Sequence, residues 1–178
     1  MMQPYQPFTG VLLMPDRKVF GTTSPVMFPN GQPVAQIRWH NWSMRARFEI
    51  LDPSGAVELA NGGRSGGFGR TYRVTAPRGE TLLEFKVGWW GKGTVILPGG
   101  QLLTTKGSWT SRKVSVYDQV ERPVARIVTT SRAFAVRQDS YAFEVGAPVL
   151  SIAQAVGLAQ CLRAAAESAR QSAAAAGG

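Results

Sequence analysis

Hydrophobic and polar residues alternate through most of the chain, in short segments that end at Gly, Pro, Asn or Asp. In residues 45–50, Ala46, Phe48 and Ile50 share one face while arginine and glutamate share the other, which predicts a half-buried strand. Further segments bring the series to roughly ten to twelve strands. These segments run from residue 11 onward and over 26–28, 33–37, 72–74, 81–87, 94–97, 101–104, 112–117, 124–128, 133–136 and 141–145.

Turn signals separate these strands. The dipeptide Asn30-Gly31 between two apolar segments predicts a type I′ hairpin, in which both central residues adopt positive φ. Residues 52–55 and 98–100 predict further turns, and the glycine-rich residues 61–70 predict a flexible loop. The pattern therefore indicates a mainly β domain built from hairpins.

The last segment of the chain follows a different pattern. Residues 149–162 contain no proline and no charged residue, and their apolar side chains spread around the whole circumference of a helix. Such a helix is either buried on all sides or spans a membrane. Because Gln154 and Gln160 interrupt the stretch, and a span needs about 20 mostly apolar residues, we predict a buried core helix over 148–166. A membrane span is the alternative. A rod of roughly 25 Å suits the axis of a closed barrel.

The chain has 178 residues, of which 44% are hydrophobic and 17% charged, so one domain with a substantial core is expected. Residues 1–9 are interpreted as a flexible lead-in, residues 10–166 as the domain, and residues 167–178 as an Ala-rich tail that frays. The N-terminus has neither the basic start nor the apolar run of a secretory signal, which favours a cytoplasmic location.

The C-terminal half resembles a known family. Segments 113–118, 122–127 and 139–145, followed by the helical residues 150–159, are similar to the closing hairpins and helix of the tubby-like barrel superfamily. The nearest branches are the LURP-one-related proteins and the phospholipid scramblases. The resemblance is best over residues 108–162 and looser over 10–107. It implies an all-β closed barrel of about 12 strands, with one hydrophobic C-terminal helix threaded through it.

The same resemblance implies a role at membranes. Tubby proteins bind phosphoinositides, and scramblases move lipids in response to calcium. This chain has no acidic calcium-binding segment beside the last helix and no cysteine cluster for lipidation. Because the tubby lipid-binding motif has no residue-by-residue match either, only the fold and a preference for membrane surfaces carry over.

Residues that could perform catalysis or bind a metal are few. His40 is the one histidine, so any Ser-His-acid triad would have to use it. Cys161 is the one cysteine and lies among apolar residues, where a free thiol behaves as a small hydrophobe. A single cysteine excludes an internal disulfide and a multi-cysteine zinc site. We therefore expect no enzyme activity, no metal and no cofactor.

Two glycine-rich segments are candidate anion-binding loops, because consecutive backbone amides can bind phosphate. Residues 62–70 precede a predicted strand and lack the Lys-Ser/Thr pair of a P-loop. Residues 91–94 fail the same test, since a glycine follows Lys92. Both segments are interpreted as ordinary hairpin loops.

The strongest functional signal is the combination of positive charge with tryptophan. The net charge is +9 and the sequence pI is about 10.4, which favours anionic partners. Arginine binds phosphate with a bidentate fork, and tryptophan prefers membrane interfaces. The predicted ligand-binding residues are Arg38, Arg45, Arg47, Arg64, Arg70, Arg73, Trp89, Trp90 and Lys92. Arginines that merely coat the strands, with tryptophans filling the barrel, are the alternative that needs no ligand.

Together these signals predict a non-enzymatic binding protein that docks on anionic membrane lipid, peripherally at the inner face of the membrane. Scramblase-like lipid translocation is one alternative. A protein-interaction scaffold with a protein partner is another, and binding of nucleic acid through stacked bases is a third.

Overall fold

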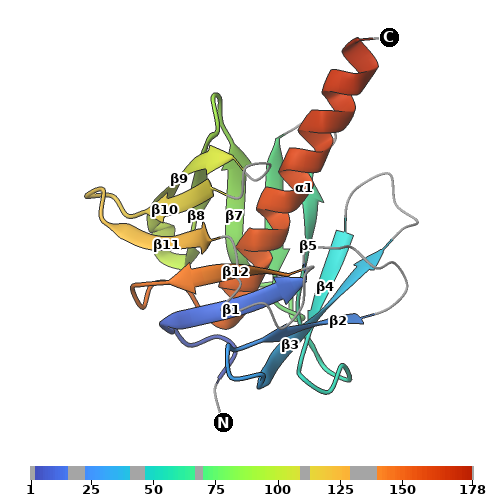
Figure 1. The fold of residues 1–178 in the computed structure, drawn as a ribbon, viewed down its shortest axis with the longest axis vertical. Helices are drawn as coiled ribbons and strands as arrows, with labels where there is room; N and C mark the ends of the chain where they lie inside the picture. Colours follow the sequence, from blue (N-terminus) through green and yellow to red (C-terminus); the bar gives the residue numbers. More distant parts are fainter. Residues whose placement is uncertain are drawn as a thin grey trace.

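The computed structural model describes residues 3–15, 23–40, 47–66, 70–108, 113–128 and 140–177. Within them it contains twelve strands, one 3-10 turn (η1) and one long helix (Figure 1). The elements are β1 (Gly10–Pro15), β2 (Thr23–Met27), β3 (Pro33–His40), β4 (Arg47–Leu51), β5 (Glu58–Ser65), β6 (Thr71–Thr75), β7 (Thr81–Val87), β8 (Lys92–Ile96), η1 (Pro98–Gly100), β9 (Leu102–Ser108), β10 (Lys113–Tyr117), β11 (Pro123–Val128), β12 (Ser140–Val145) and α1 (Ile152–Ala176).

The strands form a closed antiparallel barrel. Each strand pairs with the next one along the chain, and β1 closes the sheet against β12, from Gly10 opposite Val145 to Pro15 opposite Ser140. Closure removes the free sheet edges that would otherwise attract other chains. The barrel and its C-terminal helix confirm the predicted fold class. The strand predicted over residues 133–136 lies outside the described residues.

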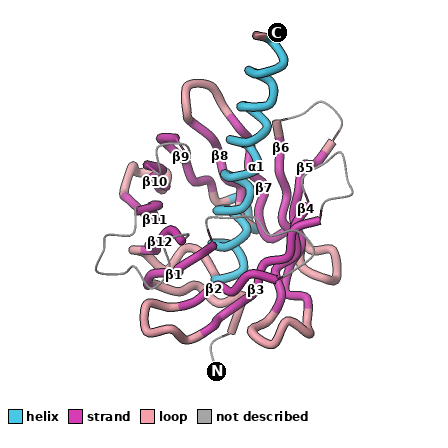
Figure 2. The backbone as a smooth tube through the Cα atoms, turned by 45° about the vertical axis from the view of Figure 1, so that its right-hand side comes forward, coloured by secondary structure: helices cyan, strands magenta, loops and turns pink. Residues whose placement is uncertain are grey.

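Helix α1 runs along the inside of the barrel and fills its core (Figure 2). Residues of its first turns, including Ala155, Val156 and Leu158, have no exposed surface. Gly157 allows the helix to approach β6, because a Cβ atom there would lie 2.9 Å from a methyl group of Val74. The circumferential apolar pattern of the sequence is therefore explained by a helix that contacts strands on all sides.

The helix begins at Ile152, and not at Pro148 as the sequence suggested. Ser151 is its N-cap, with a capping box: the Ser151 Oγ accepts from the Gln154 backbone N (3.2 Å), and the Gln154 side chain accepts from the Ser151 N (2.9 Å). Pro148 lies in the preceding turn. At its other end the helix continues past residue 166 to Ala176.

One end of the barrel, which we call the turn end, carries the short connections β2–β3, β4–β5, β6–β7, β8–β9 and β10–β11. In the first of them Gly31 has φ +85°, whereas Asn30 has no positive φ. The predicted type I′ turn is therefore wrong. The chain forms a type I turn followed by a left-handed glycine, and the register shifts between Val26 and Met27 to accommodate it.

The N-terminal residues cover the turn end. The Phe8 backbone N donates to the Leu150 carbonyl (3.0 Å), and the Pro4 carbonyl accepts from the Ala153 N (3.1 Å). The Tyr5 hydroxyl donates to the Leu59 carbonyl (2.8 Å). These contacts place the described part of the predicted lead-in, residues 3–9, against the start of α1.

At the opposite end, which we call the helix end, α1 leaves the barrel and projects beyond it (Figure 1). Its residues are buried as far as Ala164, half-buried over 165–168 and exposed from Ala169 onward. The two ends of the barrel therefore present different surfaces, one of short turns and one of a protruding helix.

Candidate functional site

Two adjacent tryptophans project from the β7–β8 hairpin at the helix end. Trp89 is 75% exposed and Trp90 is 98% exposed. Trp90 has φ +57° and Gly91 has φ +72°, so the chain turns sharply here. A Cβ atom at Gly91 would lie 2.8 Å from the Gly107 carbonyl oxygen, which requires glycine at this position. Exposed aromatic surface of this size is typical of interaction sites.

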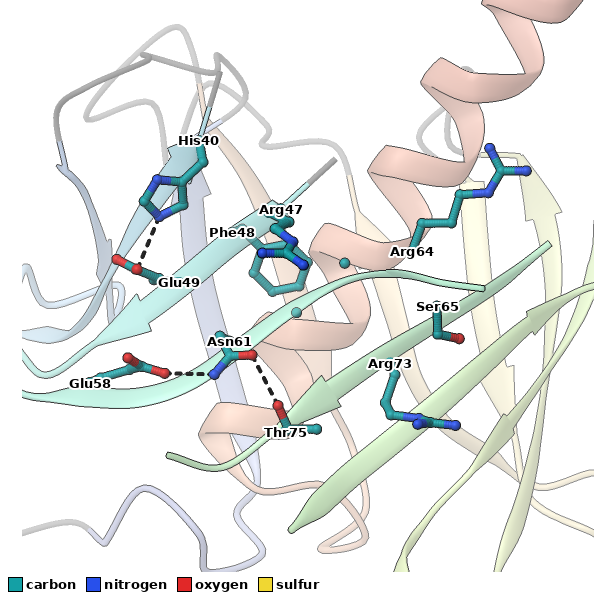
Figure 3. A pocket seen from close by; sticks show the side chains of 12 residues that line it. His40, Arg47, Phe48, Glu49, Glu58, Asn61, Arg64, Ser65, Arg73 and Thr75 are labelled. Atoms are coloured by element: carbon teal, nitrogen blue, oxygen red, sulfur yellow. Dashed lines mark hydrogen bonds and ion pairs between the residues drawn. The ribbon is translucent and has the colours of Figure 1, made fainter. Parts of the chain in front are cut away.

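Basic side chains surround this hairpin. The Arg70 guanidinium lies over the Trp89 ring, 4.9 Å from its centroid, in a cation–π contact. Lys92 begins β8 on the far side of the hairpin. Arg64, near the end of β5, points toward α1 (Figure 3). It lines a pocket of about 280 Å³ together with Arg70 and Tyr72, and burial raises the pKa of the Tyr72 hydroxyl.

A larger groove of about 730 Å³ lies between the β7–β8 hairpin and the projecting part of α1. Its inner part contains the buried side chains of Phe85, Val114 and Leu162. Its outer part contains alanines of α1 and, at the rim, three cations and one exposed tryptophan. These rim residues are Arg70, Lys92, Arg170 and Trp90.

Ion pairs neutralise the basic residues of the barrel wall. Arg38 pairs with Glu49 (3.1 Å) and Arg126 with Glu144 (2.8 Å). Arg73 pairs with Glu84 (2.9 Å), and this hydrogen bond is the main reason that the pKa of Glu84 is lowered. Such pairs contribute little to stability, but each of these arginines already faces a carboxylate, which reduces the charge available to a ligand.

The helix end differs, because its exposed cations lack acidic partners. Among the described residues, no carboxylate pairs with Arg47, Arg70, Lys92, Lys113 or Arg170, all of which lie at this end. Arg78 is also unpaired but lies in the β6–β7 turn at the turn end. Positive charge at the helix end is therefore available to an anionic partner.

A second pocket, of about 660 Å³, lies on the outer wall over β4, β5 and β6 (Figure 3). Arg47, Arg64 and Arg73 line it, together with the carboxylates Glu49 and Glu58. Glu49 also accepts from the His40 Nε2 (3.0 Å), and Glu58 accepts from the Asn61 amide (2.7 Å). Because acidic and basic groups alternate here, we do not assign this pocket to an anionic ligand.

The structure thus divides the residues that the sequence singled out. It brings Arg64, Arg70, Trp89, Trp90 and Lys92 together at the helix end. Arg38 and Arg73 lie on the wall in ion pairs, and Arg47, at the helix end of β4, lines the wall pocket and not the groove. Arg45 lies outside the described residues.

Sequence reasoning missed Arg170 and the alanines beside it, because the Ala-rich tail was expected to fray. A signal was present: residues 166, 169, 170 and 173 recur at helical spacing and form one face of α1. This face lines the groove.

Ser65 and Cys161 are the residues whose type or spacing could suggest a nucleophile. Residues 63–67 read Gly-Arg-Ser-Gly-Gly, which formally matches the Gly-x-Ser-x-Gly spacing of a nucleophile elbow. An elbow places the serine between a strand and a helix, whereas Ser65 ends β5 and the next element is β6. Burial raises the pKa of the Cys161 thiol well above its usual range, so it is protonated at neutral pH.

The described residues offer neither a metal-binding cluster nor a helix that could cross a membrane. They contain no group of three or more His, Cys, Asp or Glu side chains placed to hold a metal ion. Among them, no helix combines the length and the apolar content that crossing a membrane requires.

Comparison with known proteins identifies the fold. No family model matches the chain, and no curated protein matches it. An X-ray structure of a protein from Arabidopsis thaliana, AT5G01750, superposes with a TM-score of 0.60 and 17% sequence identity. The match covers 91% of this chain and 97% of the other. The two proteins therefore share one fold along almost their whole length.

Proposed function

We propose that this protein docks on anionic membrane surfaces through its helix end and acts by binding, without catalysis. One observation carries the proposal: the exposed pair Trp89 and Trp90 stands beside the unpaired cations Arg70 and Lys92. Peripheral membrane proteins need both an apolar anchor and positive charge, because neither alone gives stable attachment.

The expected strength follows from these groups. A basic side chain near an anionic membrane contributes about 1 kcal/mol, and the effect decays within a Debye length. A tryptophan buries about 150–250 Å² of surface, at about 25 cal/mol per Å² of apolar area. Two tryptophans and several cations support reversible binding that weakens as the salt concentration rises.

We also propose that the chain belongs to the tubby-like barrel superfamily. Two observations support this membership, the closed barrel with its axial helix and the full-length structural match, and they agree with the resemblance inferred from residues 108–162. The first half of α1 is the core of the barrel. Lipid translocation would require this core to open, so surface binding is the favoured activity.

The test is sedimentation with neutral phosphatidylcholine vesicles and with vesicles that also contain phosphatidylglycerol, each at low and high salt. We expect salt-sensitive binding to the anionic vesicles alone. Trp89→Ser/Trp90→Ser and Arg70→Glu/Lys92→Glu should each weaken it by about tenfold or more. Arg78→Glu is the matched control for each single reversal, Arg70→Glu and Lys92→Glu, since Arg78 is exposed and unpaired but lies at the turn end.

Two results would overturn the proposal. One is the absence of binding to anionic vesicles at low salt. The other is an equal loss in Arg78→Glu and in the single helix-end reversals, which would mean that net charge alone matters. Tighter binding to a single-stranded oligonucleotide than to vesicles would identify nucleic acid as the ligand instead.

A further inference from the structure

The groove between the β7–β8 hairpin and α1 changes in polarity from its inner to its outer part. Phe85, Val114 and Leu162 line its inner part and are buried and apolar, and Thr105 is a buried polar side chain beside them. Ala165 and Ala166 are half-buried, and Ala169 and Ala173 are exposed. This order, from dry and apolar to wet and basic, matches the order of groups in an anionic lipid.

We propose that this groove takes up one acyl chain of an anionic phospholipid, whose headgroup lies among Arg70, Lys92 and Arg170 at the rim. The inference rests on the proposed function, because it specifies how the helix end engages the lipid. The inference goes beyond docking on the membrane surface, because one acyl chain of a lipid molecule leaves the bilayer and enters the protein.

Glycines create the space between the hairpin and the helix. Gly88, Gly91 and Gly107 line the groove with backbone alone. The Gly107 N donates to the Gly91 carbonyl (3.0 Å), which ties the hairpin tip to β9. Gly107 has φ +112°, and a Cβ atom there would overlap the Lys113 carbonyl. The backbone therefore fixes the width of the groove, and side chains do not close it.

The dimensions suit one acyl chain. A volume of about 730 Å³ is within the range of roughly 300–1,000 Å³ that is typical of ligand pockets. From Leu162 to Ala173, α1 rises about 16 Å. One leaflet contributes half of the hydrocarbon core of a bilayer, which is about 30 Å thick. The length of the groove along α1 is therefore close to the depth that one acyl chain spans in its leaflet.

Hydrogen bonding favours an acyl chain over a peptide. A buried peptide must satisfy its backbone N–H and C=O groups, and this costs free energy where partners are absent. The alanines of α1 offer no donor or acceptor side chain, and the hydroxyl groups among the groove's described lining residues are those of Thr105 and Ser108 on β9. A hydrocarbon chain needs none and gains about 0.8 kcal/mol for each buried methylene.

The charge at the rim favours an anionic headgroup. Arg70, Lys92 and Arg170 are the charged residues that line the groove in the described part of the chain. None of them pairs with a carboxylate of the described residues. A phosphodiester at the rim would gain charge-assisted hydrogen bonds without displacing an existing ion pair.

The test uses monomeric lysophosphatidylglycerol below its micelle concentration, titrated by calorimetry. Lysophosphatidylcholine with the same chain tests the headgroup charge, and glycerol phosphate tests the acyl chain. Ala169→Trp fills the groove from an exposed position of α1. Ala175→Trp is its matched control, because Ala175 is exposed on the same helix but does not line the groove. Circular dichroism verifies that both variants fold.

We expect wild type and Ala175→Trp to bind one lysophosphatidylglycerol molecule each. Ala169→Trp should bind it at least about tenfold more weakly, because the inserted ring displaces several methylenes. Lysophosphatidylcholine should bind more weakly than the anionic lipid, and glycerol phosphate weakest of all. Vesicle sedimentation of Ala175→Trp, whose substituted side chain lies outside the groove, should equal that of wild type.

The inference is overturned if wild type does not bind the monomeric lipid, or if Ala169→Trp binds it as well as Ala175→Trp does. If wild type binds anionic vesicles but not the monomeric lipid, the inference is overturned and the proposed function stands. Monomer binding without any vesicle binding would overturn the proposed function and retain the groove as a lipid site.

Discussion

The two ends of this barrel differ in how many of their polar and charged side chains have a partner within the chain. At the turn end, Asp52 and Asp118 accept hydrogen bonds from the backbone of their own turns, which lowers the pKa of both carboxyls. Arg122 donates to Asp118 (2.8 Å), and the N-terminal residues pair with the start of α1. At the helix end, tryptophans and cations face the solvent without such partners.

We interpret this difference as a division of roles, in which the turn end contributes to stability and the helix end to function. Asp52, Asp118 and Arg122 at the turn end have partners within the chain, so their contribution is to the folded state. Local rules are broken at the helix end, where Trp90 combines full exposure with a left-handed backbone. Natural proteins concentrate such departures at functional sites, since they cost stability and persist only where something else depends on them.

The largest effect is expected from removing the helix. Deleting residues 152–178 takes out the centre of the core, where each buried side chain contributes about 1.5–3 kcal/mol. The total exceeds the about 5–15 kcal/mol stability of a typical domain, so the chain should unfold. Deleting residues 167–178 alone should leave a folded barrel, because these residues lie beyond the buried part of α1. Far-UV circular dichroism distinguishes the two, and a folded barrel without 152–178 would contradict the core role of α1.

A smaller loss is expected from crowding the helix against the wall. Gly157→Leu places a side chain where a Cβ atom alone would already lie 2.9 Å from Val74. Overpacking of this kind typically costs about 1–3 kcal/mol. Urea unfolding should show that loss, whereas Ala174→Leu, on the exposed part of the same helix, should be nearly neutral. Equal midpoints for the two variants would show that the helix–wall contact is loose.

Two residues with positive φ, one at each end of the barrel, allow a direct comparison of the two ends. Trp90 (φ +57°) lies at the helix end and Glu121 (φ +62°) at the turn end. Glycine relieves the left-handed conformation, so Trp90→Gly should raise the free energy of unfolding by about 0.5–1 kcal/mol. The same substitution at Glu121 gains less, since it also removes an ion pair with Lys106.

Membrane binding should separate these two variants. Trp90→Gly should bind anionic vesicles more weakly despite its higher melting temperature, and Glu121→Gly should bind as wild type does. Thermal melts and vesicle sedimentation of the same samples provide both readouts. Unchanged vesicle binding in Trp90→Gly would remove the functional reason for the strained tryptophan.

The smallest effect concerns the ion pairs of the wall. The Arg73 hydrogen bond lowers the pKa of Glu84 below its usual 4.5 in the folded state. Glu84 therefore stabilises the fold above pH 4.5, and this contribution is lost as the pH falls through the lowered pKa. Glu84→Gln should destabilise by less than about 1 kcal/mol at pH 7, with the difference from wild type shrinking in acid. Glu80→Gln, in the β6–β7 turn, is the control in urea titrations at both pH values.

Much of the fold was predictable because it depends on local periodicity. Alternation in residues 45–50 and 81–87 specified strands, since every second side chain of a strand faces the core. The all-round apolar pattern of residues 149–162 specified a helix enclosed by other elements. The turn type at Asn30-Gly31 was not predictable in this way, because two hairpin geometries accept the same dipeptide.

The site was predictable only in part, because residue type does not reveal which charges are already paired. Nothing in the sequence itself shows that Arg38 is paired with a carboxylate and that Arg70, within the described residues, is not. Register places Glu49 directly opposite Arg38, whereas Arg70 lies over the ring of Trp89. No pattern in a single sequence indicates which strand positions face each other across neighbouring hairpins.

The sequence by itself determined that short alternating strands would enclose an apolar helix, and that the surface would carry excess positive charge. Both properties depend only on the types of residue along the chain and their local order, and not on which residues meet in space. Only the tertiary structure decided that the unpaired cations, the two tryptophans and the alanine face of α1 would meet at one end of the barrel. The physical reason is closure: antiparallel strands send alternate connections to opposite ends, and the axial helix can leave through only one of them.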